Sequence, residues 1–194
     1  MGWPVAHSLS PRLHGYWLRR HAIDGAYVPL AVSPENLEPA LRALPALSFA
    51  GVNLTIPHKE TAVLLVDRRS PAAERIGAVN TVVVEPDGTL FGDNTDGFGF
   101  IASLMEAQVG WRAESGPAVL LGAGGAARAV AVALIDAGAP EVRVLNRTPD
   151  RARSLAEDLG GPICAVPWPE RSAALEGAAL LVNTTSLGMR NQPP

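Results

Sequence analysis

A glycine-rich turn in the second half of the chain constrains the fold most. Residues 120–128, Leu-Leu-Gly-Ala-Gly-Gly-Ala-Ala-Arg, follow a short apolar run and open a stretch with helical periodicity. In this setting Gly122 permits a tight turn, Gly124 lets backbone amides approach a pyrophosphate, and Ala127 stands where a third glycine would favour close helix–strand packing. The pattern predicts a Rossmann-like dinucleotide-binding domain. The turn residues expected to bind the cofactor are Gly122, Ala123, Gly124, Gly125 and Ala126.

The end of the next predicted strand favours NADP over NAD. About 20 residues after the turn, an NAD-binding domain supplies an acidic residue to the ribose hydroxyls. This chain has Asn146-Arg147-Thr148 there. Arg147 can pair with the adenosine 2′-phosphate, and Arg151 adds positive charge one turn later. We expect Asn146, Arg147, Thr148 and Arg151 to bind the cofactor; the alternative is a plain glycine turn with a solvent-exposed Arg147.

Strand and helix signals alternate along the chain and predict an α/β fold of two domains, residues 1–97 and 98–194. The first domain is expected to hold a mixed sheet. Its expected elements are a helix over 11–21, a strand over 26–32, a helix capped by Ser33 and opened by Pro34, a strand over 49–55, a helix over 57–66, a capped turn at Ser70-Pro71, and a hairpin of 79–85 with 90–94. The second domain is expected to contain a connecting helix over 98–107, a linker over 110–116, strands over 118–121, 141–145, 163–166 and 179–183, and helices over 124–137 and 149–159.

A lysine and an aspartate follow strand-like segments in the first domain. Residues 53–59, Asn-Leu-Thr-Ile-Pro-His-Lys, alternate polar and apolar side chains up to the proline, and Asn-Thr-Asp-Gly stands at 94–97. In open α/β folds, ligands bind outside the carboxyl ends of strands, where Asn53, Thr55 and Lys59 would then point. Lys59 and Asp96 therefore form a possible proton-transfer pair. The plainer alternative is a capped strand-to-helix turn with a solvated lysine.

Composition narrows the classes of function. With 47% apolar and 18% charged residues, the chain is expected to form a soluble globular protein. The net charge of −3 and the scattered basic residues predict no binding to nucleic acid or to an anionic membrane. Cys164 is the only cysteine and the histidines lack metal-site spacing, so we expect no metal and a reducing, cytoplasmic setting. A monomer or a homodimer is expected.

Seven motifs in order give the chain a resemblance to shikimate dehydrogenase over nearly all its length. They lie at residues 2–11, 51–59, 77–81, 94–97, 122–128, 146–148 and 183–189. The resemblance implies NADPH-dependent reduction of 3-dehydroshikimate to shikimate in aromatic amino-acid biosynthesis. It also implies two α/β domains, an N-terminal substrate domain and a C-terminal Rossmann-like NADP domain, with the active site in the cleft between them.

The resemblance also implies residue roles. Lys59 and Asp96 match the catalytic pair, with Lys59 as proton donor in reduction and Asp96 orienting it, and both are also expected to bind the substrate. Ser8 and Ser10 match the residues that bind the substrate carboxylate. A helix cap formed by Ser10 before Pro11 is an alternative that can hold at the same time. Thr55 and Asn80 match residues that bind ring hydroxyls, and Asn53 is expected only to support the strand end.

Both ends depart from the family pattern. Family members begin with a strand that leads into the Gly-x-Pro turn and continue well past the position of Pro194, so we expect a chain cut at both ends, with an incomplete NADP domain and less certain activity. Two alternatives stay open. One is a quinate/shikimate dehydrogenase that uses NAD, against which Arg147 and the pair of Ser8 and Ser10 argue. The other is a non-catalytic dinucleotide- or polyol-binding module, against which the intact Lys59 and Asp96 argue.

Overall fold

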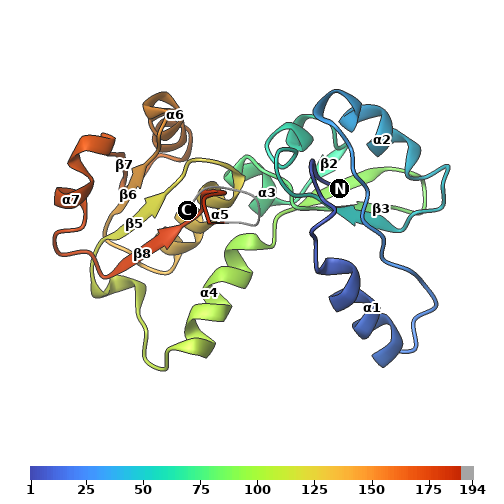
Figure 1. Ribbon diagram of the computed structural model, residues 1–194, viewed down its shortest axis with the longest axis horizontal. Coiled ribbons are helices and arrows are strands. Elements are labelled where there is room, and N and C mark those ends of the chain that lie inside the picture. Colours follow the sequence, from blue (N-terminus) through green and yellow to red (C-terminus); the bar gives the residue numbers. More distant parts are fainter. Residues whose placement is uncertain (189–194) are drawn as a thin grey trace.

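A computed structural model describes residues 1–188 and contains two sheets joined by packed helices (Figure 1). The first sheet has the strand order β1-β3-β4-β2. Its strands are β1 (Gly51–Asn53), β2 (Arg68–Arg69), β3 (Thr81–Val84) and β4 (Leu90–Asp93). β3 pairs antiparallel with β1 and with β4, whereas β2 pairs parallel with β4. This confirms the predicted mixed sheet and the predicted hairpin.

The second sheet is parallel throughout the described residues and has the order β7-β6-β5-β8. Its strands are β5 (Ala118–Leu121), β6 (Val142–Leu145), β7 (Ile163–Ala165) and β8 (Leu180–Asn183). Helices α5 (Gly125–Asp136), α6 (Pro149–Leu159) and α7 (Arg171–Ala174) connect them. α5 and α6 follow β5 and β6 in the βαβ arrangement that the glycine-rich turn predicted, which confirms the Rossmann-like fold.

Each half has its own apolar core. In the first half, Leu37 and Leu41 of α2 (Leu37–Ala43) and the adjacent Leu44 are buried in one apolar cluster with Leu54, which follows β1, and Leu90 of β4. In the second half, β5, β6, α5 and α6 enclose a core of Val, Leu and Ala side chains. By contrast α1 (Ser10–Arg20) buries none of its residues and projects from the first half (Figure 1). No helix in the described part of the chain is long and apolar enough to cross a bilayer.

The two halves are joined through α5. Helix α4 (Asp96–Ala107) packs along it, and Ile76 of α3 (Pro71–Ile76) packs on its residues Ala129 and Val132. Gly97 makes the α4 contact close, because a Cβ at this position would lie 2.9 Å from the backbone oxygen of Ala129. The expected boundary between residues 97 and 98 falls within the first turn of α4 and stays a prediction.

The predicted helix over residues 57–66 is wrong. Residues after Pro57 form turns and a short 3-10 helix, Thr61–Leu64. The backbone oxygen of Lys59 accepts a hydrogen bond of 2.8 Å from the amide of Val79, which precedes β3. That oxygen bonds to a segment far along the chain in place of the amide of residue 63, which would be its partner in an α-helix. The tertiary contact determines the local structure here and keeps Lys59 beside the sheet.

The predicted strand over residues 26–32 is also wrong in extent. Only a single parallel bridge forms, between Gly2 and Ala31. Pro29 has no amide hydrogen to donate to a neighbouring strand. The helix expected after Ser33 is present as a 3-10 turn, Pro34–Asn36, followed by α2, but the Ser33 hydroxyl bonds Glu35 and Asn36 side chains instead of capping the backbone. The Ser70 cap is confirmed, since its hydroxyl accepts from the amide of Ala73.

His58 anchors the turn that carries Lys59. Its side chain is 1% exposed, and its Nε2 lies 2.8 Å from the carbonyl oxygen of Val32. The Nε2–H donates this bond when the ring is neutral. Burial lowers the pKa of His58, and the bond to Val32 opposes this only in part. The fold therefore favours the neutral imidazole.

We predict that acidification destabilises the protein through His58. The folded-state pKa lies below the unfolded value of about 6.5, so the unfolded chain binds more protons between the two values. The stabilisation is complete above about pH 6.5 and is lost as the pH falls through the folded-state pKa. Urea midpoints measured from about pH 8 to pH 5 should fall more steeply for the wild type than for His58→Gln. Parallel profiles would show that another group titrates.

Candidate active and cofactor site

Lys59, Asp96 and Asn80 form a connected polar group between the halves. The Nζ of Lys59 lies 2.6 Å from the Oδ2 of Asp96, and the Nδ2 of Asn80 donates to Oδ1 of the same carboxylate at 2.8 Å. Both carboxylate oxygens are thus engaged. The side chains of Lys59 and Asp96 are 17% and 27% exposed, so the pair is largely shielded but still reaches solvent. The structure brings together the two residues expected to act on a proton.

Local structure fixes the position of Asp96. It is the first residue of α4, where a negative charge interacts favourably with the helix dipole. Its amide donates to Oδ1 of the buried Asn94 at 3.0 Å, and the Nδ2 of Asn94 donates to the carbonyl of Ala78 at 2.9 Å. Asn94 therefore ties the start of α4 to the chain segment before β3. This explains why the Asn-Thr-Asp-Gly motif follows directly after β4.

A polar cavity of about 250 Å³ lies beside Asp96. Five of the six residues expected to bind the substrate line it: Ser8, Ser10, Thr55, Asn80 and Asp96. The sixth, Lys59, reaches it through the bond to Asp96. All lining residues come from the first half of the chain. Apart from Lys59 and Asp96, the expected binding groups are neutral hydroxyls and amides, which can orient a polar ligand by hydrogen bonds.

The serine pair does not cap α1 as the alternative interpretation expected. The helix begins at Ser10 with Leu9 as its N-cap, and no side chain caps it. Instead the Oγ of Ser8 accepts from the amide of Ser10 at 3.2 Å. Capping a helix needs a residue before the first turn, whereas Ser10 already lies within it. The Ser10 side chain therefore lines the cavity and does not cap the helix.

Tyr27 is a cavity residue that the sequence analysis missed. Its hydroxyl donates to Oδ1 of Asn53 at 2.9 Å, and Nδ2 of Asn53 donates to Thr81. Burial raises the pKa of Tyr27, so the phenol stays protonated and remains a donor. Both the oxygen and the nitrogen of the Asn53 amide are therefore hydrogen-bonded within the protein, as its expected supporting role requires. No motif or periodicity marks Tyr27, because it stands in an irregular segment.

The glycine-rich turn has the geometry of a phosphate cradle. Gly122 follows β5 with φ +109°, and its amide donates to the carbonyl of Leu145 at the end of β6. Gly124 is the extended N-cap of α5 and makes no side-chain cap bond. The first amides of α5 are thus available to an anion, with the helix dipole in support. The turn fits a dinucleotide pyrophosphate.

The other expected cofactor residues lie at the next strand end. Asn146, Arg147 and Thr148 lie between β6 and α6, and Arg151 is in the first turn of α6. Asn146 stabilises this loop by donating from Nδ2 to the carbonyl of Thr148 at 2.9 Å. Arg147 is exposed. Because the carboxyl ends of β5 and β6 are adjacent, two guanidinium groups lie on the same edge of the sheet as the glycine turn.

The substrate and cofactor groups meet at Lys59. A Cβ at Gly125 would lie 3.0 Å from the Cβ of Lys59 and 3.4 Å from that of Ala78. A side chain at position 125 would therefore crowd Lys59, and glycine lets the start of α5 approach the lysine closely. A ligand bound to the glycine turn and one bound in the polar cavity would therefore both lie near Lys59.

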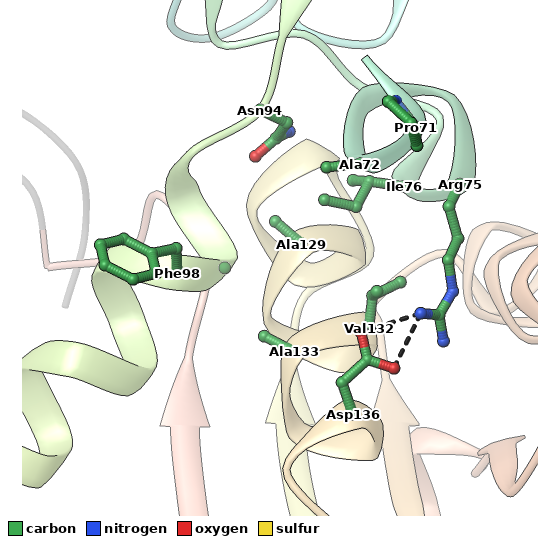
Figure 2. A pocket seen from close by; sticks show the side chains of 11 residues that line it. Pro71, Ala72, Arg75, Ile76, Asn94, Phe98, Ala129, Val132, Ala133 and Asp136 are labelled. Carbon is green, nitrogen blue, oxygen red and sulfur yellow. Dashed lines mark hydrogen bonds and ion pairs between the residues drawn. The ribbon is translucent and has the colours of Figure 1, made fainter.

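A second cavity does not belong to this site. It measures about 290 Å³, lies among α3, α4 and α5, and is lined mainly by small and apolar side chains (Figure 2). None of the residues expected to bind substrate or cofactor lines it. At its rim Arg75 and Asp136 form an ion pair of 2.7 Å.

Two further residues near the glycine turn escaped the sequence analysis. Glu60 bonds Arg151, with 3.2 Å between its Oε1 and the arginine Nη2. Thr184 follows β8 and donates from Oγ1 to the carbonyl of Leu121 at 2.7 Å. Thr184 belongs to the motif over 183–189, whose position after a strand is the signal that could have marked it. The last residue of that motif, Met189, lies outside the described residues.

Family models match both halves of the chain. A model described as the shikimate dehydrogenase substrate binding domain matches residues 1–82. A second, described as shikimate / quinate 5-dehydrogenase, matches residues 103–188. The two matches lie on either side of the start of α4, where the polar cavity and the glycine turn come together.

Individual relatives match the whole chain. Proteins named shikimate dehydrogenase (NADP(+)) are 60% identical over 192 residues in Paramagnetospirillum magneticum and 61% identical over 198 residues in Rhodospirillum rubrum. These matches cover 99% and 100% of this chain and 70% of each relative. The crystal structure of shikimate 5-dehydrogenase from Thermus thermophilus with NADP(H) and shikimate matches with a TM-score of 0.83 and 45% identity, covering 99% of this chain and 71% of that one.

We predict that Gly122→Ala destabilises the protein by about 1–3 kcal/mol and weakens dinucleotide binding. The alanine would have to keep a φ of +109°, and its methyl group would lie 2.7 Å from the Oγ1 of Thr184. Gly161→Ala is the matched control, because Gly161 also has a positive φ, +67°, but nothing within 4 Å of the added Cβ. Urea denaturation measures the stability of both variants. Equal losses would mean that the contact with Thr184 is unimportant.

Proposed function

Because the chain belongs to the shikimate dehydrogenase family, we propose that it reduces 3-dehydroshikimate to shikimate with NADPH. This makes it an NADP-dependent oxidoreductase of aromatic amino-acid biosynthesis. The observation that carries the assignment is the position of Lys59. It pairs with Asp96 beside the polar cavity and contacts Gly125 of the glycine turn, so one side chain borders both expected ligands.

Lys59 is suited to the proton transfer. NADPH supplies the hydride when bound, and negative charge then develops on the ketone oxygen of the substrate. An ammonium at that oxygen stabilises the charge and donates the proton. Lys59 is the only lysine in the sequence, whereas every other basic side chain apart from histidine is arginine. Arginine could provide the charge but cannot give up a proton at physiological pH, so the lysine stands where proton transfer is needed.

The neighbouring residues orient the reaction. Asp96, held by Asn80 on one oxygen, fixes Lys59 with the other. Ser8 and Ser10 bind the substrate carboxylate, and Thr55 and Asn80 bind ring hydroxyls. A substrate that lacks one of these hydroxyls would leave a polar group of the cavity unpaired, which disfavours its binding.

The cofactor residues divide into two groups. The backbone of Gly122, Ala123, Gly124, Gly125 and Ala126 holds the pyrophosphate at the start of α5. Asn146, Arg147, Thr148 and Arg151 form the site for the adenosine 2′-phosphate, with the two guanidinium groups supplying charge. We infer further that the enzyme works in the cytoplasm as a monomer or a homodimer. The absence of a membrane-spanning helix among residues 1–188 is compatible with that location.

The direct test is an assay of NADPH oxidation on addition of 3-dehydroshikimate. Our proposal predicts turnover with this pair, and slower turnover when NADH replaces NADPH or 3-dehydroquinate replaces the substrate. Faster reaction with NADH and 3-dehydroquinate would favour the NAD-using quinate/shikimate dehydrogenase. Cofactor binding without turnover of either substrate would favour the non-catalytic module.

We predict that Arg147→Ala weakens NADPH binding by about 1.5–3 kcal/mol and hardly changes NADH binding, because only NADPH carries the 2′-phosphate. Titration calorimetry with both cofactors measures the difference. Arg112→Ala is the charge-matched control, since Arg112 is exposed and precedes β5, at the end of the strands opposite to the cofactor residues. Equal losses for the two cofactors in Arg147→Ala would contradict the assignment.

We predict that Lys59→Ala lowers kcat by roughly 10²–10⁴-fold with a far smaller change in KM, because proton donation is lost while the serine and arginine contacts remain. Lys59→Met should be nearly as poor, since its stem has similar length and cannot donate a proton. Circular dichroism tests whether both variants are folded. A folded variant with kcat within a few-fold of the wild type would show that Lys59 is not the proton donor.

A further inference from the structure

The carboxylate of Glu60 lies beside the start of α5, where the dinucleotide is expected to bind. Glu60 directly follows Lys59 in the first half of the chain, whereas its partner Arg151 belongs to α6 in the second half. The Nη2 of Arg151 donates to the Oε1 of Glu60 at 3.2 Å. The bond thus joins the two halves at the guanidinium expected to serve the cofactor.

The same carboxylate oxygen also lies beside the glycine turn. A Cβ built at Gly124 would be 3.7 Å from the Oε1 of Glu60, which is ordinary van der Waals contact. Gly124 is the N-cap of α5, where the helix dipole and free amides attract negative charge. One oxygen of Glu60 therefore lies next to both features, the helix start and the guanidinium, that a dinucleotide phosphate would use.

We propose that Glu60 sets the affinity for the cofactor by acting as an internal anion that the cofactor phosphates must displace. This rests on the proposed function, because it requires a dinucleotide at the glycine turn. Two negative groups cannot both pair closely with Arg151 without repelling each other. In this proposal the cofactor phosphate takes the place of Glu60 at Arg151, and the Glu60 side chain turns toward solvent.

The exposure of the pair makes this displacement easy. The side chains of Arg151 and Glu60 are 55% and 44% exposed. Ion pairs with such access to water are weak and are screened by salt. Glu60 thus lowers cofactor affinity moderately without closing the site. Its effect should be larger for NADPH than for NADH, since only the 2′-phosphate competes directly for Arg151.

The test compares Glu60→Gln with the wild type in titrations of NADPH and NADH, followed by intrinsic tryptophan fluorescence. The dissociation constant for NADPH should fall about two- to ten-fold at low salt, that for NADH should fall less, and both effects should shrink at high salt. Glutamine keeps the size of the side chain and removes the charge. An unchanged or weaker NADPH affinity in this variant overturns the proposal.

A matched control separates the local effect from a change in net charge. Asp136→Asn removes the same charge from another ion pair that joins the halves, Arg75–Asp136 at 2.7 Å (Figure 2). Asp136 is the last residue of α5, whereas Gly124 precedes its first, so the two lie at opposite ends of the helix. The NADPH affinity of Asp136→Asn should match the wild type. A gain as large as that of Glu60→Gln overturns the proposal.

A double variant assigns the effect to Arg151. In an Arg151→Ala background, Glu60→Gln should lose most of its gain for NADPH, because the contested guanidinium is gone. A full gain in that background overturns the competition for Arg151. NADPH binding by the wild type separates the two proposals. If the wild type binds NADPH and Glu60→Gln has the same affinity, the role of Glu60 fails and the proposed function stands. If the wild type binds neither cofactor, both fail.

Discussion

Close packing of α5 against the first half of the chain determines where the chemical groups meet. The contact depends on two missing side chains. Gly97 lets α4 approach the backbone of Ala129, and Gly125 lets the start of α5 approach Lys59. A side chain at either position would crowd its neighbours, because backbone and Cβ atoms give way less easily than the end of a flexible side chain. The glycine turn is therefore held beside the lysine.

Charge is distributed unevenly around this contact. The polar cavity offers neutral groups from Ser8, Ser10, Thr55 and Asn80, and the pair of Lys59 and Asp96 lies at its edge. The cofactor edge carries Arg147 and Arg151. The expected sites for a polyhydroxylated substrate and a phosphorylated cofactor are thus distinct, and Lys59, the proposed proton donor, lies between them. Glu60 adds an acid from the first half of the chain to this cationic edge.

Elements with a strong local signal in the sequence were predictable. The range of α6 was predicted without error, because Pro149 opens it and Gly160 follows it. β5 was likewise predicted from a short apolar run. The segment after Pro57 was not, since the bond from Val79 to Lys59 joins residues far apart in the chain. The 3-10 turn at Trp168–Glu170 and α7 were missed for want of any periodic signal.

The same difference between local sequence signals and long-range contacts decides which site residues could be predicted. The glycine turn and Arg147 could be predicted from spacing, because the distance between consecutive strand ends in a βαβ unit is nearly constant. Strand-end positions suggested Lys59 and Asp96, 37 residues apart, as a pair, and the family resemblance gave each its role. Tyr27 and Glu60 act through side chains in irregular segments, and nothing in their sequence neighbourhood indicates a partner.

The single lysine permits a direct measurement of the central claim, that Lys59 borders both ligands. Protein labelled with 13C at the lysine Cε gives one side-chain signal, which belongs to Lys59. The account predicts that saturating shikimate shifts this signal and that NADP+ shifts it further, through the contact with Gly125. A signal that stays in place when shikimate saturates the protein would contradict the account.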